Sequence, residues 1–425
     1  MQVIIVGGGW AGCAAAYAAK MAGTDVILLE KTDMLLGTGL VGGIMCNNGR
    51  LTALEEARAL GGGDFIALIE SVIRHRDLNF PGHRHAMLYD VTKIEPVVRG
   101  FLTRCGVTIK LQTRMTEAFV SDGYIKGLVT ANDEILHGDV FVDTTGSAGP
   151  AKNCTRFGSG CAMCILRCPS FGPRVSLTAK AGLPEIMAGE NFAHFEAMSG
   201  SCKLDKGSLE ATLVQQLEHS GVLVIPLPPS MYKDDLLSSK ACQQYALTEF
   251  ARNLVILDTG HAKLMTPFFP LEKLRTLKGF TNARYADPYS GGRGNSVRFM
   301  AMCYCNDALQ VDGVKNLFCA GEKTGPLVGH TEAIVTGFIA GYNAVRLLAG
   351  LEPLVLPDDL AVGDIISYMH QEIKETAGLS KKYTFSGSVY FARMQEKGLY
   401  TTDTSDIHER VSRAGLKLLL GKRLI

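Results

Sequence analysis

The hydrophobic positions at the start of the chain alternate between short apolar runs and one alanine-rich stretch. Consecutive apolar residues over 3–6 predict a buried parallel strand, and residues 13–22 predict a helix. A second apolar run over 26–29 predicts another strand. Because two strands joined by a helix form a βαβ unit, we expect a parallel sheet covered by helices.

Glycines mark the turn between the first strand and the helix. Gly7, Gly9 and Gly12 follow the spacing G-x-G-x-x-G, with Trp10 and Ala11 between the last two. The first glycine allows a tight turn, the second lets the backbone approach a pyrophosphate, and the third lets the helix pack closely on the sheet. The free N–H groups at the helix N-terminus favour phosphate. This pattern predicts a dinucleotide-binding site.

The end of the second strand completes that motif. Glu30 ends the strand and is followed by Lys31. An acidic residue about twenty positions after the glycines accepts hydrogen bonds from a ribose diol in such sites.

A glycine-rich segment over 35–50 comes next. Its glycines, among them Gly42, suit a backbone that passes close to a flat ligand. Cys46 lies within this segment, and two interpretations stay open. It is either a small buried hydrophobic residue or a thiol near the reactive end of a cofactor.

The following stretch mixes helical periodicity with strand signals. Residues 51–105 predict helices around a polar loop over 80–87, which suits either a solvated face or an anionic ligand, and we favour the solvated face. Residues 107–133 alternate around Asp122-Gly123, which predicts a hairpin. The strand over 140–143 then ends in a small-residue turn that includes Thr145 and Gly146.

A second strand–loop–helix unit lies far along the chain. Residues 317–320 predict a strand, and a long helix starts near 329–331. The helix carries small residues where it must pack closely: Ala333, Gly337, Ala340 and Gly341. A helix so placed aims its positive end at the O2/N1 side of an isoalloxazine and stabilises reduced flavin. We find no second G-x-G-x-x-G between a strand and a helix. The predicted cofactor is therefore FAD.

These elements define the predicted organisation. We expect an α/β protein with a doubly wound, Rossmann-like FAD-binding domain assembled from residues 1–150 and 281–350. An α+β substrate domain over 151–280 is inserted between them, and a helical C-terminal tail covers 351–425.

A cluster of cysteines lies in the first part of the predicted substrate domain. Cys161, Cys164 and Cys168 follow the spacing C-x-x-C-x-x-x-C-P, and Cys154 or Cys202 would supply a fourth ligand. Three interpretations stay open: an iron–sulfur cluster, a redox or catalytic set of thiols, and inert packing.

Composition limits the remaining classes of function. The chain has 425 residues, of which 47% are hydrophobic and 20% charged, and a formal net charge of +1. This balance gives no general attraction to nucleic acid. No apolar run reaches the length of a membrane span, and the first strand leaves no room for a leader, so we expect a cytoplasmic protein. A homodimer is left open.

The chain resembles FAD-dependent oxidoreductases of the glutathione-reductase-like superfamily. The nearest families are glucose-inhibited division protein A and the methylenetetrahydrofolate–tRNA (uracil-5-)methyltransferase. The resemblance is carried by the segment LFCAGEKTGPLVGHTEAIVTGFIAGYNAV, which begins at Leu317, and by LPDDLAVGDIISYM over 356–369. Cys46-Asn-Asn and Arg167-Cys-Pro-Ser are also similar to segments of these families.

The resemblance implies further site residues and three functions. It places Gly321, Glu322, Gly329 and Thr331 at the flavin and ribityl chain, and the backbone of Met115 beside the adenine. The first function is redox chemistry at flavin N5 on a small-molecule or electron-carrier substrate, assisted by Cys46 and the 161–168 thiols. The second is folate-dependent methylation of an RNA uracil. The third is an electron-transfer subunit that carries FAD and an iron–sulfur centre.

Overall fold

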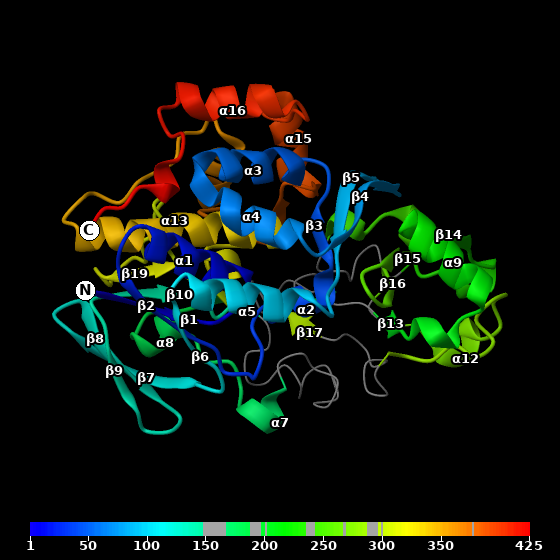
Figure 1. Cartoon of the computed structure of the whole chain (residues 1–425), viewed down its shortest axis with the longest axis horizontal. Helices are drawn as coiled ribbons and strands as arrows, with labels where there is room; N and C mark the ends of the chain where they lie inside the picture. Colours follow the sequence, from blue (N-terminus) through cyan, green and yellow to red (C-terminus); the bar gives the residue numbers. More distant parts are fainter. Residues whose placement is uncertain are drawn as a thin grey trace.

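The computed structural model describes residues 1–147, 167–187, 197–199, 202–234, 243–266, 269–286, 296–298, 301–375 and 378–425. Figure 1 shows a central sheet with helices above it, a smaller sheet below it and a separate set of elements to one side. Cys161 and Cys164 lie outside the described residues, as does Cys154.

The central sheet has five parallel strands in the order β19-β10-β1-β2-β6. The strands are β1 (Gln2–Val6), β2 (Asp25–Leu29), β6 (Thr108–Lys110), β10 (Val140–Asp143) and β19 (Leu317–Cys319). Three segments distant in sequence therefore join one sheet. This arrangement confirms the predicted α/β fold.

The two faces of this sheet are covered differently. Val3 and Ile5 of β1 pack among helices, whereas Ile4 and Val6 pack against a small antiparallel sheet and α8. The helices are α1 (Trp10–Met21), α3 (Arg50–Ala57), α4 (Gly63–Glu70), α5 (Ile94–Arg104) and α13 (His330–Leu348), with a π-helical turn over Arg58–Gly62. The small sheet consists of β7 (Met115–Ser121), β8 (Tyr124–Thr130) and β9 (Ile135–His137), and α8 is Leu177–Lys180. The turn predicted at Asp122-Gly123 joins β7 and β8, and these two residues have φ of 54° and 77°.

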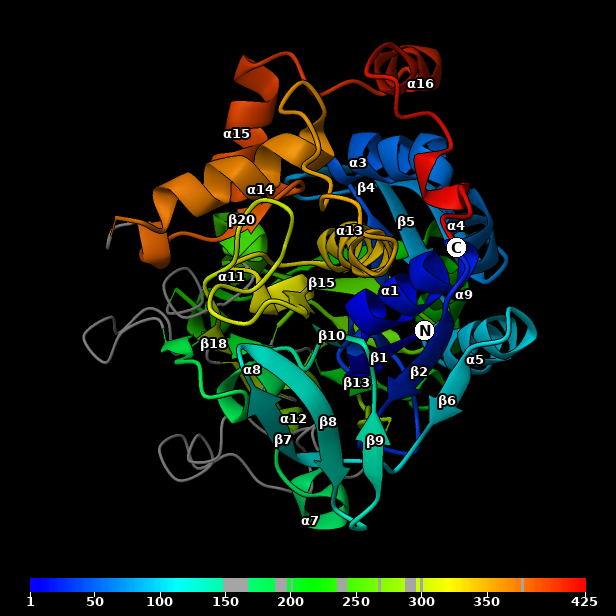
Figure 2. The same cartoon turned by 90° about the vertical axis from the view of Figure 1, so that its left-hand side faces the viewer.

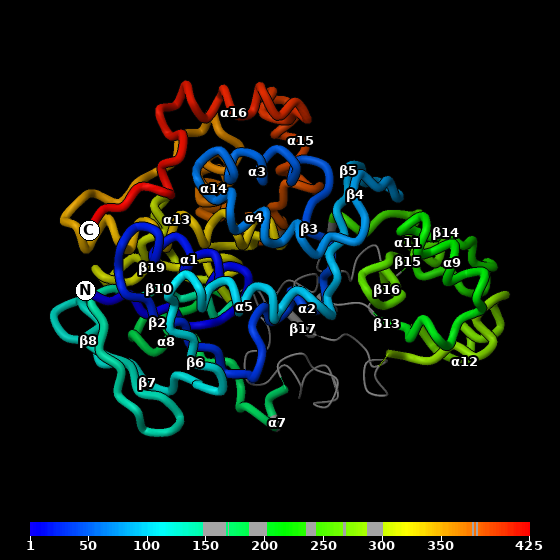
Figure 3. Tube along the Cα trace, viewed as in Figure 1, coloured from blue at the N-terminus to red at the C-terminus, as the bar shows by residue number. Residues whose placement is uncertain are grey.

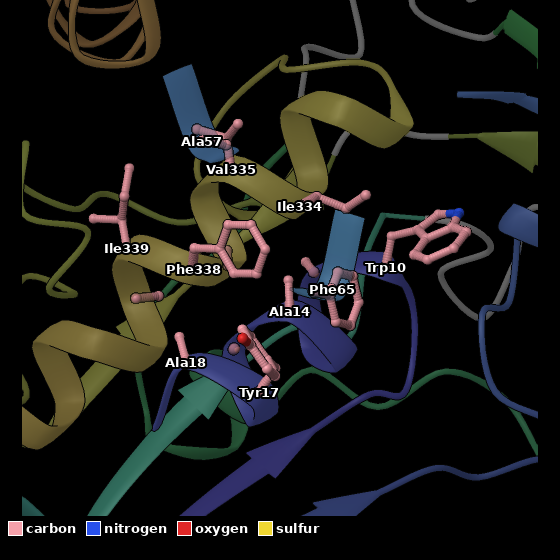
Figure 4. Close-up of a cluster of buried hydrophobic side chains, with 14 of the residues drawn as sticks. Trp10, Ala14, Tyr17, Ala18, Ala57, Phe65, Ile334, Val335, Phe338 and Ile339 are labelled. Carbon is pink, nitrogen blue, oxygen red and sulfur yellow. The ribbon is translucent and has the colours of Figure 1, made fainter. Parts of the chain in front are cut away.

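Helices α1 and α13 touch through their small residues. A Cβ atom on Gly337 would overlap the backbone oxygen of Ala11, and one on Gly341 would overlap that of Ala15. Beside this contact, Tyr17 of α1 packs against Phe65 and Phe338, with ring centroids 5.6 and 6.1 Å away (Figure 4). The small residues predicted to allow close packing therefore do so.

The elements at the side of the molecule form a second antiparallel sheet in the order β13-β16-β15-β14. Its strands are β13 (Lys203–Leu204), β14 (Val222–Pro226), β15 (Asn253–Asp258) and β16 (Ala262–Leu264). Helices α9 (Ala211–Ser220), α11 (Thr248–Arg252) and α12 (Leu271–Leu274) accompany it. Shorter elements are α7 (Cys168–Phe171), β11 (Ile186–Met187) with β18 (Ala301–Met302), and β12 (Ala197–Ser199) with β17 (Ser296–Arg298).

Residues 80–87 are not the polar loop that the sequence predicts. They belong to a hairpin of β4 (Ile73–Phe80) and β5 (His83–Tyr89), which pairs with β3 (Ile44–Cys46). Phe80 and Leu88 share a core with Phe250 and Leu257 of the inserted region. The hairpin forms because its apolar partners lie about 170 residues away, where local periodicity cannot show them.

The C-terminal part packs over α3, as Figure 2 shows. It contains α14 (Ala361–Glu372), β20 (Tyr383–Thr384), α15 (Ser388–Glu396) and α16 (Thr404–Arg413). The two ends of the chain meet near β2, because Asp25 donates to Met1 and Leu424 donates to Ala22 (Figure 3). Over the described ranges, no helix is both long enough and apolar enough to cross a membrane.

Candidate functional site

A large cavity opens at the carboxyl ends of the parallel strands, with about 1810 Å³ of empty space that includes open solvent. Gly7 after β1, Glu30 after β2, Thr144 after β10 and Ala320 after β19 all line it. Ligands of open α/β sheets bind at this edge of the strands. The fold therefore places a ligand site where the sequence predicts one.

The glycine motif shapes one wall of the cavity. Gly7 has φ +108°, which an L side chain rarely adopts, and a Cβ on Gly12 would overlap the Gly7 backbone oxygen. Gly9 differs, because no atom lies within 4 Å of the position its Cβ would take. Gly9 lines the cavity and directly precedes α1. Its missing side chain leaves space at a helix N-terminus, which suits a phosphate group.

Glu30 is held rigidly at the cavity wall. Its two carboxylate oxygens accept hydrogen bonds from the backbone N–H groups of Gly8 and Thr32, each at 2.8 Å. The residue is buried but lines the cavity. Neighbouring Lys31 also lines it and donates to the Gly172 carbonyl at 3.1 Å.

The N-terminus of α13 faces the same cavity. Gly329, which precedes the helix, and His330, which begins it, are both lining residues. His330 Nδ1 lies 3.1 Å from the Ile44 oxygen and 3.3 Å from the Tyr89 hydroxyl. Two helix N-termini, those of α1 and α13, therefore direct partial positive charge into one cavity.

A buried ion pair supports the start of α13. Arg50 Nε lies 3.0 Å from both carboxylate oxygens of Glu332, and both side chains are nearly inaccessible to water. Burial acts to lower the pKa of Arg50, but the Glu332 carboxylate holds that pKa above its ordinary value. Arg50 also donates to the Val328 oxygen and the Thr384 hydroxyl at 3.1 and 3.2 Å. The pair fixes the loop before α13 to α3.

The inserted region supplies the opposite wall. Within residues 243–266, four residues line the cavity: Gln244, Tyr245, Lys263 and Met265. Lys263 Nζ donates to the Val41 oxygen at 3.2 Å and also to that of Gly42. An amide, a phenol ring, an ammonium group and a thioether therefore face the glycine-rich segment.

Charged residues close the other end of the cavity. Arg174 lines it, donates to the Gly146 oxygen at 2.9 Å and pairs with Glu185 at 3.1 Å. Glu185 also pairs with Lys323, which lies 3.8 Å from Asp143. Burial acts against the charge of Glu185, but Lys323 and Arg174 hold its pKa below the ordinary value.

Three residues that line this cavity carry a buried polar atom without a hydrogen-bond partner in the part of the chain that the structure describes. These atoms are Trp10 Nε1, Arg174 Nε and Gln244 Oε1. Buried polar groups are nearly always paired, because an unpaired one costs free energy. Two donors and an acceptor left open around one cavity fit a polar ligand such as a dinucleotide.

Most of the predicted binding residues meet at this cavity. Those that line it are Gly7, Gly9, Trp10, Ala11, Glu30, Lys31, Gly42, Met115, Thr145, Gly146, Gly321, Glu322 and Gly329. Gly12 and Thr331 do not line it. Gly12 packs on the turn of the glycine motif, and the Thr331 hydroxyl donates to the Met45 oxygen at 2.6 Å.

The described candidate cysteines do not line the cavity. Cys46 ends β3 with no accessible surface, and burial raises the pKa of its thiol. Cys168 begins the short α7, and Cys202 is buried in the core of the inserted sheet. Two arginines of this segment pair with carboxylates: Arg167 with Asp33 and Arg174 with Glu185. Among the residues that the structure describes, no group of three His, Cys, Asp or Glu side chains suits a metal ion.

Sequence reasoning missed several lining residues, among them Arg50, Gln244, Lys263 and His330. His330 directly follows the predicted residue Gly329. It could have been predicted, because a side chain at the start of α13 lies near the ligand that the helix N-terminus faces. The others come from elements whose place in space depends on long-range packing.

Comparison with known families gives one match over most of the chain. The model of the family described as glucose inhibited division protein A matches residues 2–246 and 269–352. Among solved structures, the GidA of Aquifex aeolicus in its form II crystal has a TM-score of 0.58 and 17% identity. That alignment covers 97% of this chain and 76% of the other, and form I gives a TM-score of 0.57. At this identity the likeness shows a shared fold.

Curated relatives match shorter stretches. The methylenetetrahydrofolate–tRNA-(uracil-5-)-methyltransferase TrmFO of Bacillus cytotoxicus is 36% identical over 101 residues, which is 23% of this chain and 22% of the relative. The protein of the same name from Desulforudis audaxviator is 47% identical over 53 residues, 12% of each chain. The matches therefore span about a fifth or less of the relatives' length.

Proposed function

We propose that this chain, which belongs to the glucose-inhibited division protein A family, binds FAD in the cavity and acts as a flavin-dependent oxidoreductase. The observation that carries the proposal is the meeting of two helix N-termini, a glycine turn and a fixed carboxylate at the ends of parallel strands. When bound, FAD supplies hydride and electron transfer at its N5 atom.

Residues of the first βαβ unit would hold the adenosine and pyrophosphate parts. The open space at Gly9 and the N–H groups that begin α1 suit the pyrophosphate. Glu30 is fixed by two backbone donors and suits the ribose diol. Met115, Thr145 and Gly146 line the same part of the wall.

The start of α13 and Lys263 would stabilise negative charge on the reduced ring system. Glu332 lies in the first turn of α13, where a carboxylate would compete for the positive end of the helix dipole. Arg50 neutralises it through Nε, which donates to both carboxylate oxygens. Lys263 adds a positive charge beside Gly42. Cys46 contributes packing in this proposal, because burial keeps its thiol protonated.

The reduction potential of bound FAD tests this arrangement. We expect a potential above that of free FAD, since the helix terminus and Lys263 favour the reduced, negatively charged form. Lys263→Met should lower it, whereas Lys278→Met, on an exposed position, should leave it unchanged. Anaerobic titration against a reference dye measures it. A potential at or below that of free FAD, unaffected by Lys263→Met, contradicts the proposal.

A second candidate function is folate-dependent methylation of an RNA uracil. The similarity to relatives named as methylenetetrahydrofolate–tRNA-(uracil-5-)-methyltransferases favours it. It predicts that the protein loaded with reduced FAD converts uridine in a tRNA transcript to 5-methyluridine with methylenetetrahydrofolate, since the reduced flavin would supply the two electrons that turn the methylene into a methyl group. It also predicts that RNA binding weakens with salt. Mass spectrometry of the digested RNA and a binding titration measure both. If neither is observed, the candidate fails.

The electron-transfer subunit with an iron–sulfur centre stays a prediction. Three of its five candidate cysteines, those at 154, 161 and 164, lie outside the described residues. Iron and acid-labile sulfide in the anaerobically purified protein test it. Near-stoichiometric amounts of both support it, and their absence removes it.

A further inference from the structure

We propose that the side-chain amide of Gln244 is a recognition group that pairs with a cyclic amide, a ring N–H beside a ring C=O, in the cavity. This inference rests on the proposed FAD-binding function and adds to it the chemistry that the inserted region recognises.

The first observation is an unpaired acceptor in a buried place. Gln244 is only 5% exposed and lines the cavity. Its Oε1 is buried without a hydrogen-bond partner among the described residues, while its backbone oxygen is paired with His83 Nε2. A buried amide oxygen without a donor is unfavourable unless a ligand supplies one.

The second observation is that the backbone of Gln244 is fixed. His83 Nε2 lies 2.9 Å from the Gln244 backbone oxygen, and burial lowers the pKa of His83 to about 3. The ring is therefore neutral, with its single proton on Nε2 donated to Gln244. Nδ1 then accepts from the side-chain amides of Asn47 and Asn48 at 2.9 and 3.3 Å.

The same network leads to the start of α13. Asn47 Oδ1 accepts from Arg50 at 3.1 Å, and Arg50 holds Glu332 of α13. Asn47, Arg50, His83 and Glu332 are all buried. A continuous set of buried polar contacts therefore fixes Gln244 relative to the helix that faces the flavin end. A rigidly held amide can discriminate between ligands that a mobile one would bind equally.

The neighbours of Gln244 define the ligand class. Tyr245 and Met265 give the same wall an aromatic ring and a thioether, which contact a flat ring well. A carboxamide presents an acceptor and a donor side by side. Its complement is a ring that presents N–H and C=O side by side, as paired amides read base edges.

Two sources offer this chemistry in the cavity. One is the pyrimidine ring of the flavin itself, whose N3–H lies between two carbonyls. The other is a substrate with a pyrimidine-like ring. Both make the same contact with Gln244, so the experiment has one arm for each source.

The variants are Gln244→Met, which keeps the shape and removes both polar atoms, and Gln244→Glu, which keeps an acceptor. Gln216→Met, on the exposed face of α9, is the matched control. In the first arm, fluorescence titration compares FAD with 3-methyl-FAD. In the second, flavin absorbance of the FAD-loaded protein is followed with uridine monophosphate and its 3-methyl derivative.

We expect the parent protein to prefer the N–H form about tenfold in one arm. Gln244→Met should abolish that preference, Gln244→Glu should change it, and Gln216→Met should retain it. Discrimination in the FAD arm assigns Gln244 to the flavin, and discrimination in the uridine arm assigns it to the substrate.

Two outcomes overturn the inference, and they are distinguishable. If the parent protein binds FAD but discriminates in neither arm, or if Gln244→Met discriminates as the parent does, the role of Gln244 is wrong and the proposed function stands. If the parent protein binds no FAD, both the role of Gln244 and the proposed function are wrong.

Discussion

Glu56 shows how one buried carboxylate ties distant segments together. It has no accessible surface, and its oxygens accept from the backbone N–H groups of Ala361 and Val362 at 3.0 and 2.9 Å. These two residues begin α14, so Glu56 of α3 caps that helix from outside. Arg410 of α16 lies 3.4 Å away. Burial raises the pKa of Glu56 from 4.5 to about 7.

The raised pKa predicts a pH dependence of stability. The folded protein holds the Glu56 proton more tightly than the unfolded chain, so this contribution to stability is complete below about pH 4.5 and lost as the pH rises through about 7. Across this range the free energy of unfolding of the parent protein should fall by about 3 kcal/mol because of Glu56. Glu56→Gln should not show this decrease. Urea unfolding at pH 5 and pH 8 measures it.

In that experiment, exposed Glu396→Gln should follow the parent protein at both pH values. If the difference in unfolding free energy between Glu56→Gln and the parent protein is the same at pH 5 and pH 8, the raised pKa is wrong.

Packing of α1 against α13 controls the geometry between elements. Both helices begin at the cavity, and their separation depends on glycines at the contact, because a Cβ on Gly341 would overlap the backbone of Ala15. A change in this separation would therefore move both positive helix ends relative to a bound ligand.

Gly341→Ala should destabilise the protein by at least about 2 kcal/mol, because the overlapping atom is backbone and cannot rotate away. It should also weaken FAD binding by displacing one helix start. Thermal unfolding and an FAD titration measure the two effects.

Gly63 of α4 provides the comparison, since its Cβ would lie 3.6 Å from Arg58, an ordinary contact, and its φ is −57°. Gly63→Ala should therefore cost nothing. Equal stability of Gly341→Ala and Gly63→Ala would show that the helices do not pack as described.

Elements with a strong local signal were predictable. The β1–α1–β2 unit was readable because its apolar period and its glycines are all local, and α13 was readable from its small residues. The β4–β5 hairpin was not, because the charged residues Arg74 and Arg76 interrupt its apolar pattern and its apolar partners come from residues 245–265. Strand character that arises from distant packing leaves little trace in a local window.

At the scale of the whole molecule, the cavity joins two walls of different origin. The predicted wall comes from strand ends and helix starts of the FAD-type domain. The wall with Gln244 and Lys263 comes from the inserted region, and its placement depends on the buried network through His83 and Arg50. This network joins residues up to about 280 positions apart, so no local sequence motif predicts it.

At the same scale, the prediction of Cys46 as a catalytic thiol was wrong. Its place in a glycine-rich segment allowed a catalytic thiol, but pairing of β3 with β5 leaves it no accessible surface. Sequence proximity to a cofactor loop does not determine which way a side chain points, since strand pairing decides it.

The most direct test of the FAD site uses Gly9. A side chain there meets no atom within 4 Å, and the backbone has φ −68°, so Gly9→Val should fold with an unchanged melting temperature in the absence of cofactor. The new side chain would occupy the space expected for the pyrophosphate. Gly421→Val is the control, because a side chain there also meets no atom within 4 Å. Gly421 also lies far along the chain from the residues that line the cavity.

The decisive measurement is an FAD titration of the parent protein, Gly9→Val and Gly421→Val by fluorescence quenching. We predict one FAD per chain for the parent protein and Gly421→Val, and an affinity lower by about a hundredfold or more for Gly9→Val, equal to a loss of about 3 kcal/mol. Binding of FAD to Gly9→Val with the affinity of the parent protein would contradict the account.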